Sequence, residues 1–192
     1  MDRVFATASW AIVVRGLLTI GFGVAVLVVP RGLHGLALLF VAYAVLNGLV
    51  LLVGGLWASE SGPGWRLLVA EGLIGFLLGI FTPMWQGRSG PQLLAGIAVW
   101  GLATGLLQLA QTRRLGEARA SAGLVVAGLA AIGFGGASAL LMPFLGDVAA
   151  PGQPLTFVAA AYGFVAGTAF LVFGAQARAA YRGSPEEPSP DP

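Results

Sequence analysis

The chain has 192 residues, of which 57% are hydrophobic and only 9% are charged, and its mean hydropathy is +0.88. A soluble domain carries roughly 25% charged residues, so this chain has too little polar material to cover a soluble fold, and lipid is the expected solvent. The lack of cysteine excludes disulfides and thiolate chemistry, and a single histidine excludes a histidine cluster for a metal. The net charge of +2 comes with ten arginines and no lysine, which in a membrane protein reflects loop charges and not nucleic-acid binding.

Apolar runs of about 20 residues, the length that crosses the hydrocarbon core of a bilayer, predict six membrane-spanning helices. The predicted spans are residues 10–29, 33–56, 65–82, 91–110, 121–142 and 155–174. The third span is the shortest and contains Glu71, and Pro83 is interpreted as the breaker that ends it. Arg15 lies inside the first run and no small-residue cleavage site follows, so we expect this run to be a span and not a signal peptide.

The distribution of arginines predicts the orientation of the chain. Short connections make neighbouring spans antiparallel, and six spans place both termini on one side. The arginines on the side of the termini are Arg3, Arg66, Arg113, Arg114, Arg119, Arg178 and Arg182. Only Arg31 and Arg88 fall on the other side, so the positive-inside rule predicts cytoplasmic termini. Residues 1–178 then form one transmembrane domain, and residues 179–192 form a disordered, acidic, proline-rich cytoplasmic tail.

Small residues recur at matching places and predict an internal repeat. In the second, fourth and sixth spans an aromatic residue is followed at once by a small residue and, five positions after the aromatic, by a glycine. The three sets are Tyr43-Ala44 with Gly48, Trp100-Gly101 with Gly105, and Tyr162-Gly163 with Gly167. Three parallel hairpins of this kind would pack around an axis along the membrane normal, so we expect an all-α, pseudo-threefold bundle of six helices.

Glycines one turn apart allow helix backbones to approach closely in lipid, where no hydrophobic effect drives helices together. The third span offers Gly75 and Gly79 as such a pair. The residues we expect in helix packing are therefore Gly48, Gly75, Gly79, Gly101, Gly105, Gly163 and Gly167.

Two formal charges lie well inside the predicted spans. Arg15 precedes Gly16 as Glu71 precedes Gly72, and each lies about one and a half helical turns beyond a tryptophan on the side of the termini. Because each charge would be costly alone in the membrane, we expect Arg15 and Glu71 to form an ion pair between the first and third spans. It would be a proton or anion site or a structural staple, unless Arg15 instead reaches the lipid headgroups. The third repeat has Ala127 at this place, which argues against a threefold ion pore.

Other polar groups are few. Asn47, Thr104 and Gln108 are interpreted as partners in hydrogen bonds between helices, and the alternative is that they line a polar cavity. His34 and Asp147 are the titratable groups expected on the outer side, where a histidine is either a pH sensor or inert. We find no nucleophile elbow and no phosphate-binding loop. We therefore expect no catalytic residue, no metal site and no cofactor.

With these motifs the chain resembles the HdeD-like family of bacterial inner-membrane proteins over nearly all of residues 9–178. The residues that carry the resemblance are Trp10, Arg15-Gly16, Gly21-Phe22-Gly23, Pro30, Tyr43 and Asn47-Gly48, with a weaker echo at Trp65, Gly72, Gly79 and Pro83. The family is described as six spans built from repeated hairpins, associated in some members with survival at low pH and high cell density. The chain departs from it in Glu71, in its shortened third span and in its acidic tail.

The resemblance implies a non-enzymatic role in acid or envelope stress resistance in a bacterial cytoplasmic membrane. Two other classes remain open. One is a small proton, ion or solute channel or transporter, favoured if the polar residues surround one water-accessible cavity. The other is a structural subunit of a larger membrane complex, favoured if a glycine face such as Gly163 with Gly167 points outward. The expected partners are the lipid bilayer and either further copies of the chain or a larger membrane complex.

Overall fold

The structure, a computed structural model, describes residues 3–29, 32–85, 90–113, 118–144 and 153–182. These residues are helical or in short turns, and no strand occurs among them. The long helices are α2 (Ser9–Val28), α3 (Gly32–Trp57), α4 (Trp65–Trp85), α5 (Gly90–Thr112), α6 (Ala118–Leu141) and α7 (Gln153–Arg182). The short elements are α1 (Arg3–Thr7) and the two 3₁₀ turns η1 (Ser59–Ser61) and η2 (Met142–Phe144).

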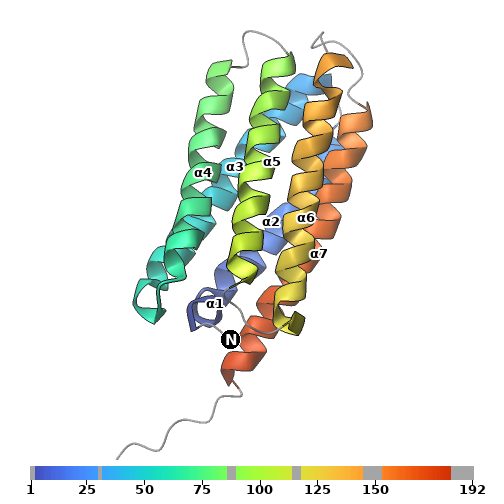
Figure 1. Cartoon of the computed structure of the whole chain (residues 1–192). Helices are drawn as coiled ribbons and strands as arrows, with labels where there is room; N and C mark the ends of the chain where they lie inside the picture. Colours follow the sequence, from blue (N-terminus) through green and yellow to red (C-terminus); the bar gives the residue numbers. More distant parts are fainter. Residues whose placement is uncertain (1–2, 30–31, 86–89, 114–117, 145–152, 183–192) are drawn as a thin grey trace, which may run out of the picture.

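The six long helices form a ring. Each packs against the next along the chain, and α7 also packs against α2, which closes the ring. The closest pairs are α3 with α4, α5 with α6, and α2 with α7. Figure 1 shows α1 and the last turns of α7 at the same end of the bundle, which we call the terminal end. All six long helices are long and apolar enough to cross a membrane, so the chain has the architecture of a multi-pass membrane protein.

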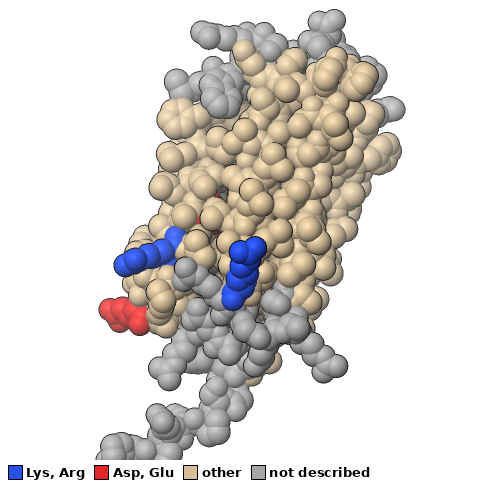
Figure 2. Space-filling view, viewed as in Figure 1, with Lys and Arg blue, Asp and Glu red and all other residues tan. Residues whose placement is uncertain are grey.

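The outer surface of the bundle is apolar along the middle of the helices. Leucines and valines in mid-helix, such as Leu17, Leu46 and Leu106, are about half exposed and face away from the core. Among the described side chains, the exposed charged ones are Glu60, Arg66, Arg113 and Arg178. In the view of Figure 2 the charged atoms gather in the half of the molecule nearer the terminal end, and the remaining described surface is uncharged. Such a surface suits lipid and not water.

Glycines bring the three closest helix pairs together. A Cβ added to Gly48 would lie 2.7 Å from the carbonyl oxygen of Gly72, which leaves no room for a side chain between α3 and α4. Corresponding glycine contacts join α5 to α6 and α7 to α2. Measured from a Cβ added to the first glycine of each contact, the distances are 2.6 Å from Gly105 to Gly128 O, 2.9 Å from Gly167 to Gly16 O, 2.9 Å from Gly101 to Gly135 Cα and 2.5 Å from Gly163 to Gly23 Cα. Each of these glycines faces a neighbouring helix inside the ring.

Two glycines of the third predicted span, Gly75 and Gly79, pack differently. Gly79 lies tightly against Val45, with 2.7 Å between its added Cβ and Val45 Cγ2. The added Cβ of Gly75 lies 3.5 Å from Ala44 O, 3.5 Å from Trp100 Nε1 and 3.6 Å from Gly48 Cα. Gly75 therefore also packs against the backbone of α3, but less tightly than Gly79 does.

Three element boundaries differ from those expected. Helix α4 continues past Pro83 to Trp85, so Pro83 does not end the helix, whereas the apolar span Trp65–Thr82 agrees with the predicted one and is the shortest of the six. Pro83 has no N–H to donate to the preceding turn, and the helix ends two residues later; just before it, the Thr82 hydroxyl donates to Leu78 O. Helix α7 reaches Arg182, so residues 179–182 are helical and not part of a tail, whereas residues 183–192 lie outside the described residues. Helix α1 was not expected, because a run of five residues carries no periodicity.

Candidate functional site

The two charges predicted inside the membrane meet in the core. Arg15 on α2 is 2% exposed and Glu71 on α4 is 1% exposed. Arg15 Nη2 donates to Glu71 Oε1 at 2.5 Å. Burying either charge alone would be strongly unfavourable, and a direct charge-assisted hydrogen bond offsets that penalty for both. The pair therefore joins α2 to α4 across the inside of the ring.

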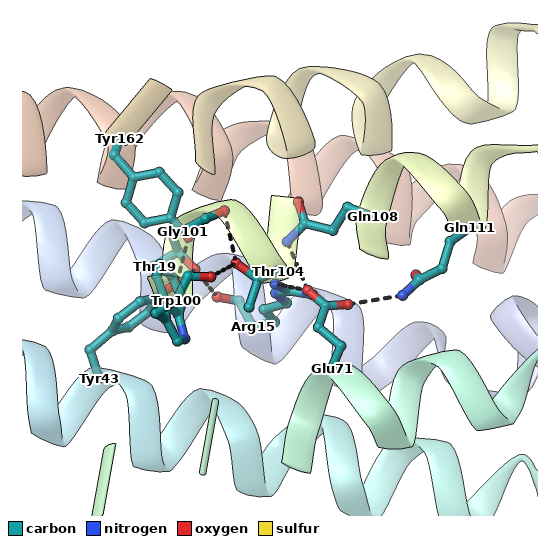
Figure 3. A network of polar contacts seen from close by, with 10 residues as sticks. All are labelled: Arg15, Thr19, Tyr43, Glu71, Trp100, Gly101, Thr104, Gln108, Gln111 and Tyr162. Atoms are coloured by element: carbon teal, nitrogen blue, oxygen red, sulfur yellow. Dashed lines mark hydrogen bonds and ion pairs between the residues drawn. The ribbon is translucent and has the colours of Figure 1, made fainter. Parts of the chain in front are cut away.

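Two glutamines from α5 complete the surroundings of the carboxylate. Gln108 Nε2 donates to Glu71 Oε1 at 2.7 Å, and Gln111 Nε2 donates to Glu71 Oε2 at 3.0 Å. Figure 3 shows both amides reaching towards the carboxylate from the same helix. Because three donors bind the two oxygens, the negative charge of Glu71 is stabilised by neighbours from two other helices. We call Arg15, Glu71, Gln108 and Gln111 the polar layer.

The other face of the guanidinium packs on an aromatic ring. The Cζ atom of Arg15 lies 4.0 Å from the centroid of the Phe170 ring on α7, a cation–π contact. Two buried polar atoms of this layer have no hydrogen-bond partner, Arg15 Nε and Gln108 Oε1. The polar layer thus contacts α2, α4, α5 and α7, and part of its hydrogen-bonding capacity is unused.

A chain of hydroxyl groups runs from Arg15 towards the middle of the bundle. Thr19 donates to its own helix at Arg15 O, 2.8 Å away, and its hydroxyl lies 3.1 Å from that of Tyr43 on α3. The Tyr43 hydroxyl in turn lies 2.9 Å from that of Tyr162 on α7 (Figure 3). These three side chains are buried. They give α3 a polar contact with α2 and α7.

Aromatic rings fill the axis beyond these hydroxyls. Trp100 on α5 is fully buried and makes edge contacts with the rings of Tyr43 and Tyr162 at 5.6 and 5.9 Å. Phe22 stacks on Tyr43 at 4.6 Å, and Phe134 stacks on Tyr162 at 5.0 Å. We call these five residues the aromatic layer. All five side chains are buried and fill the core one to two turns beyond the ion pair, on the side away from the terminal end.

The remaining predicted site residues are not all part of this arrangement. Asn47 is buried but its Oδ1 has no partner, so it makes no hydrogen bond through that atom. Thr104 donates to Trp100 O at 2.8 Å on its own helix, and the expected hydrogen bond to another helix is wrong. A threonine in a helix can bond the carbonyl one turn back without any partner from outside. The side chain of His34 and all of Asp147 lie outside the described residues.

Several members of the site were not among the predicted site residues. Gln111 follows Gln108 and Thr104 at helical spacing, so three polar residues on one face of a span could have indicated it. The tyrosines were interpreted only as markers of a repeat, although buried tyrosine hydroxyls usually find a partner. Thr19 shares a face with Arg15, one turn away, and could have been found in the same way.

The described residues contain no group of three or more histidine, cysteine, aspartate or glutamate side chains that could hold a metal ion. What the arrangement does chemically is neutralise two opposite charges and tie five helices together. Comparisons with protein-family models, with curated proteins and with solved structures found no match to this chain.

Proposed function

We propose that the chain is an HdeD-like protein of a bacterial cytoplasmic membrane, with a non-enzymatic role in resistance to acid or envelope stress. The observation that carries the proposal is the enclosed polar layer. Glu71 is 1% exposed, and its two oxygens accept three hydrogen bonds from Arg15, Gln108 and Gln111. Such a site holds the bundle together and presents no reactive group to a substrate. A sealed, rigid bundle suits a protein that must keep its structure in a stressed envelope.

The orientation belongs to the same proposal. Exposed arginines such as Arg66, Arg113 and Arg178 are next to helix ends or in the last turns of α7, which supports cytoplasmic termini under the positive-inside rule. Labelling of a terminal tag in intact and permeabilised cells tests on which side of the membrane the termini lie. A tag that is accessible in intact cells would contradict this orientation.

A three-hairpin, pseudo-threefold arrangement is also part of the proposal. Its support is the glycine contact that recurs between α3 and α4, α5 and α6, and α7 and α2, at Gly48, Gly105 and Gly167. If the three positions are equivalent, leucine at each should prevent folding to a similar degree, because each side chain would meet a backbone. Gly133→Leu on α6 is the matched control, since nothing lies within 4 Å of its added Cβ. Size-exclusion profiles in mild detergent measure the result, and three unequal effects would contradict equivalence.

The functional test is a survival assay. Bacteria that express the chain should survive a shift to strongly acidic medium, or an envelope stress such as detergent, better than matched cells with an empty vector. Cells that express Gly105→Leu are the second control, because that variant should not assemble. Equal survival of all three strains, with the wild-type chain present in the membrane by immunoblot, would contradict the proposal.

A proton or ion transporter is the second candidate, and one observation favours it. The hydroxyls of Thr19, Tyr43 and Tyr162 form a hydrogen-bonded chain next to Arg15, whose Nε has no partner. Groups of this kind carry protons in membrane proteins. The chain of hydroxyls ends among the rings of the aromatic layer, so we rank this candidate below the non-conducting role.

A further inference from the structure

The short helix α1 closes the terminal end of the bundle. It contacts α2, α3, α7 and the turn η1, and it is shown at that end in Figure 1. Val4 and Phe5 are almost completely buried, as is Ala8, which follows α1. A helix of five residues has little stability of its own, so these apolar side chains hold it in place. Helix α1 is therefore held on the bundle by these side chains, and the single residue Ala8 joins it to α2, with Ala8 N donating to Val4 O and Ile12 N donating to Ala8 O.

Phe5 reaches from α1 into the axis of the ring. Its ring makes an edge contact with Phe173 on α7, with 5.5 Å between centroids. A second contact lies at the end of α1, where the hydroxyls of Thr7 and Ser61 are 3.0 Å apart. Phe5 is the largest apolar side chain that holds α1, so loss of its ring is expected to favour local opening of this short helix.

Behind Phe5 lies a small cavity that also touches the polar layer. Its volume is about 10 Å³, and Arg15 and Gln111 supply its polar wall. The apolar wall is formed by Phe5, Ile12, Leu51, Leu68, Leu124, Phe170 and Phe173. A cavity of this size has room for about one water molecule. Arg15, whose buried Nε has no partner, needs a further hydrogen-bond acceptor, which a water would provide.

We propose that this cavity is a water site and that α1 is the plug that separates it from the aqueous phase at the terminal end. Release of α1 removes Phe5 from the axis and admits water to Arg15 and Gln111. The aromatic layer closes the other side, so the opened site communicates with the terminal side alone. The proposal is independent of the stress role, because it concerns access to the polar layer whatever the cell uses the protein for.

Cysteine labelling tests the plug directly, because the native chain has no cysteine. Leu124→Cys places a thiol on the cavity wall at a position that is 3% exposed. The full chain in detergent is treated with a negatively charged methanethiosulfonate, because a charged reagent reaches only thiols that are open to water. In the Phe5→Ala background we expect labelling to be faster by about tenfold or more, because the loss of a buried phenyl ring favours the open state of α1.

A disulfide provides the opposite test. Thr7→Cys with Ser61→Cys replaces two hydroxyls whose oxygens are 3.0 Å apart, so the two new thiols are expected to lie near each other and can be joined by oxidation. Once this bond is oxidised, Leu124→Cys should not be labelled, and labelling should return after reduction and removal of the reductant. Leu94→Cys on α5 is a fully buried control that does not line the cavity and should stay unlabelled throughout.

Two results would overturn the proposal. One is an equal labelling rate at Leu124→Cys with and without Phe5. The other is labelling of Leu94→Cys in the Phe5→Ala background, because the bundle would then have loosened as a whole. Neither result bears on survival under stress, so failure of the plug and failure of the proposed function can be told apart.

Discussion

The polar layer and the aromatic layer lie next to each other in the core, share only α2 and α5, and are held together in different ways. In the polar layer Arg15 and Glu71 need each other, because either charge alone would be buried without a partner. In the aromatic layer Trp100 has an indole Nε1 with no hydrogen-bond partner, so its contribution is the volume and shape of its ring. The comparison indicates that the polar layer joins α2 to α4 and α5 through directional contacts, while ring packing fills the space between the helices.

The same contrast separates the three predicted hairpins. The positions before Gly16, Gly72 and Gly128 are occupied by Arg15, Glu71 and Ala127, so only two of them can form the pair. The aromatic positions, by contrast, are filled in all three hairpins, by Tyr43, Trp100 and Tyr162. The aromatic positions therefore recur three times in the sequence, whereas the two charges have no third counterpart.

The largest effect is expected in the polar layer. Glu71→Ala leaves Arg15 buried without its partner, and we expect a loss of about 3 to 5 kcal/mol in the free energy of unfolding. Unfolding titrations with a denaturing detergent in mixed micelles measure it. Glu60→Ala, which removes an exposed carboxylate, is the matched control and should have little effect. A loss below about 1 kcal/mol for Glu71→Ala would show that the pair does not hold the helices together.

The double variant sharpens this prediction. Replacing Arg15 and Glu71 together by methionine removes both charges and leaves side chains of similar length in an apolar core. Buried ion pairs can be replaced in this way with little loss, but Gln108 and Gln111 would lose the acceptor of their buried amides, so we expect the stability to recover only in part, by about 1 to 3 kcal/mol relative to Glu71→Ala. If the double variant were as unstable as Glu71→Ala, the loss of stability would come mainly from Gln108 and Gln111 without their acceptor and not from an unpaired Arg15.

A smaller effect is expected in the aromatic layer. Trp100→Phe leaves a cavity but no unpaired polar atom, because the indole nitrogen has no partner to lose. We expect a loss of about 1 to 2 kcal/mol by the same titration. Trp57→Phe is the control, since Trp57 is 73% exposed. If Trp100→Phe were as damaging as Glu71→Ala, the distinction between the two layers would not hold.

The sequence alone predicts the helices well because lipid imposes a simple rule on their length and composition. The six apolar runs correspond to the six long helices of the structure, with shifts at their ends. The end of α4 was missed because proline usually breaks helices, but Pro83 lies in the last turn, where few hydrogen bonds remain to be broken. Helix α1 was missed because it is stabilised by docking and not by its own sequence.

The site was harder to predict than the spans. Arg15 and Glu71 lie at about the same distance from the terminal side of their spans, which predicts an ion pair, because an unpaired charge inside a membrane is costly. The side chains that complete it depend on how the helices are rotated about their axes, which the sequence does not state. Thr104 and Gln108 share a face of α5, yet only Gln108 is placed to reach the carboxylate.

The central claim is that the enclosed polar layer stabilises the bundle and does not conduct protons. Purified protein in liposomes with an imposed pH gradient tests it most directly, with Glu71→Ala and Tyr43→Phe measured beside the wild type. We expect wild-type liposomes to be as tight to protons as liposomes without protein, because Glu71 is saturated with donors and the aromatic layer closes the axis. A proton flux in the wild type that is lost in Glu71→Ala or Tyr43→Phe would contradict the claim and identify the protein as a proton transporter.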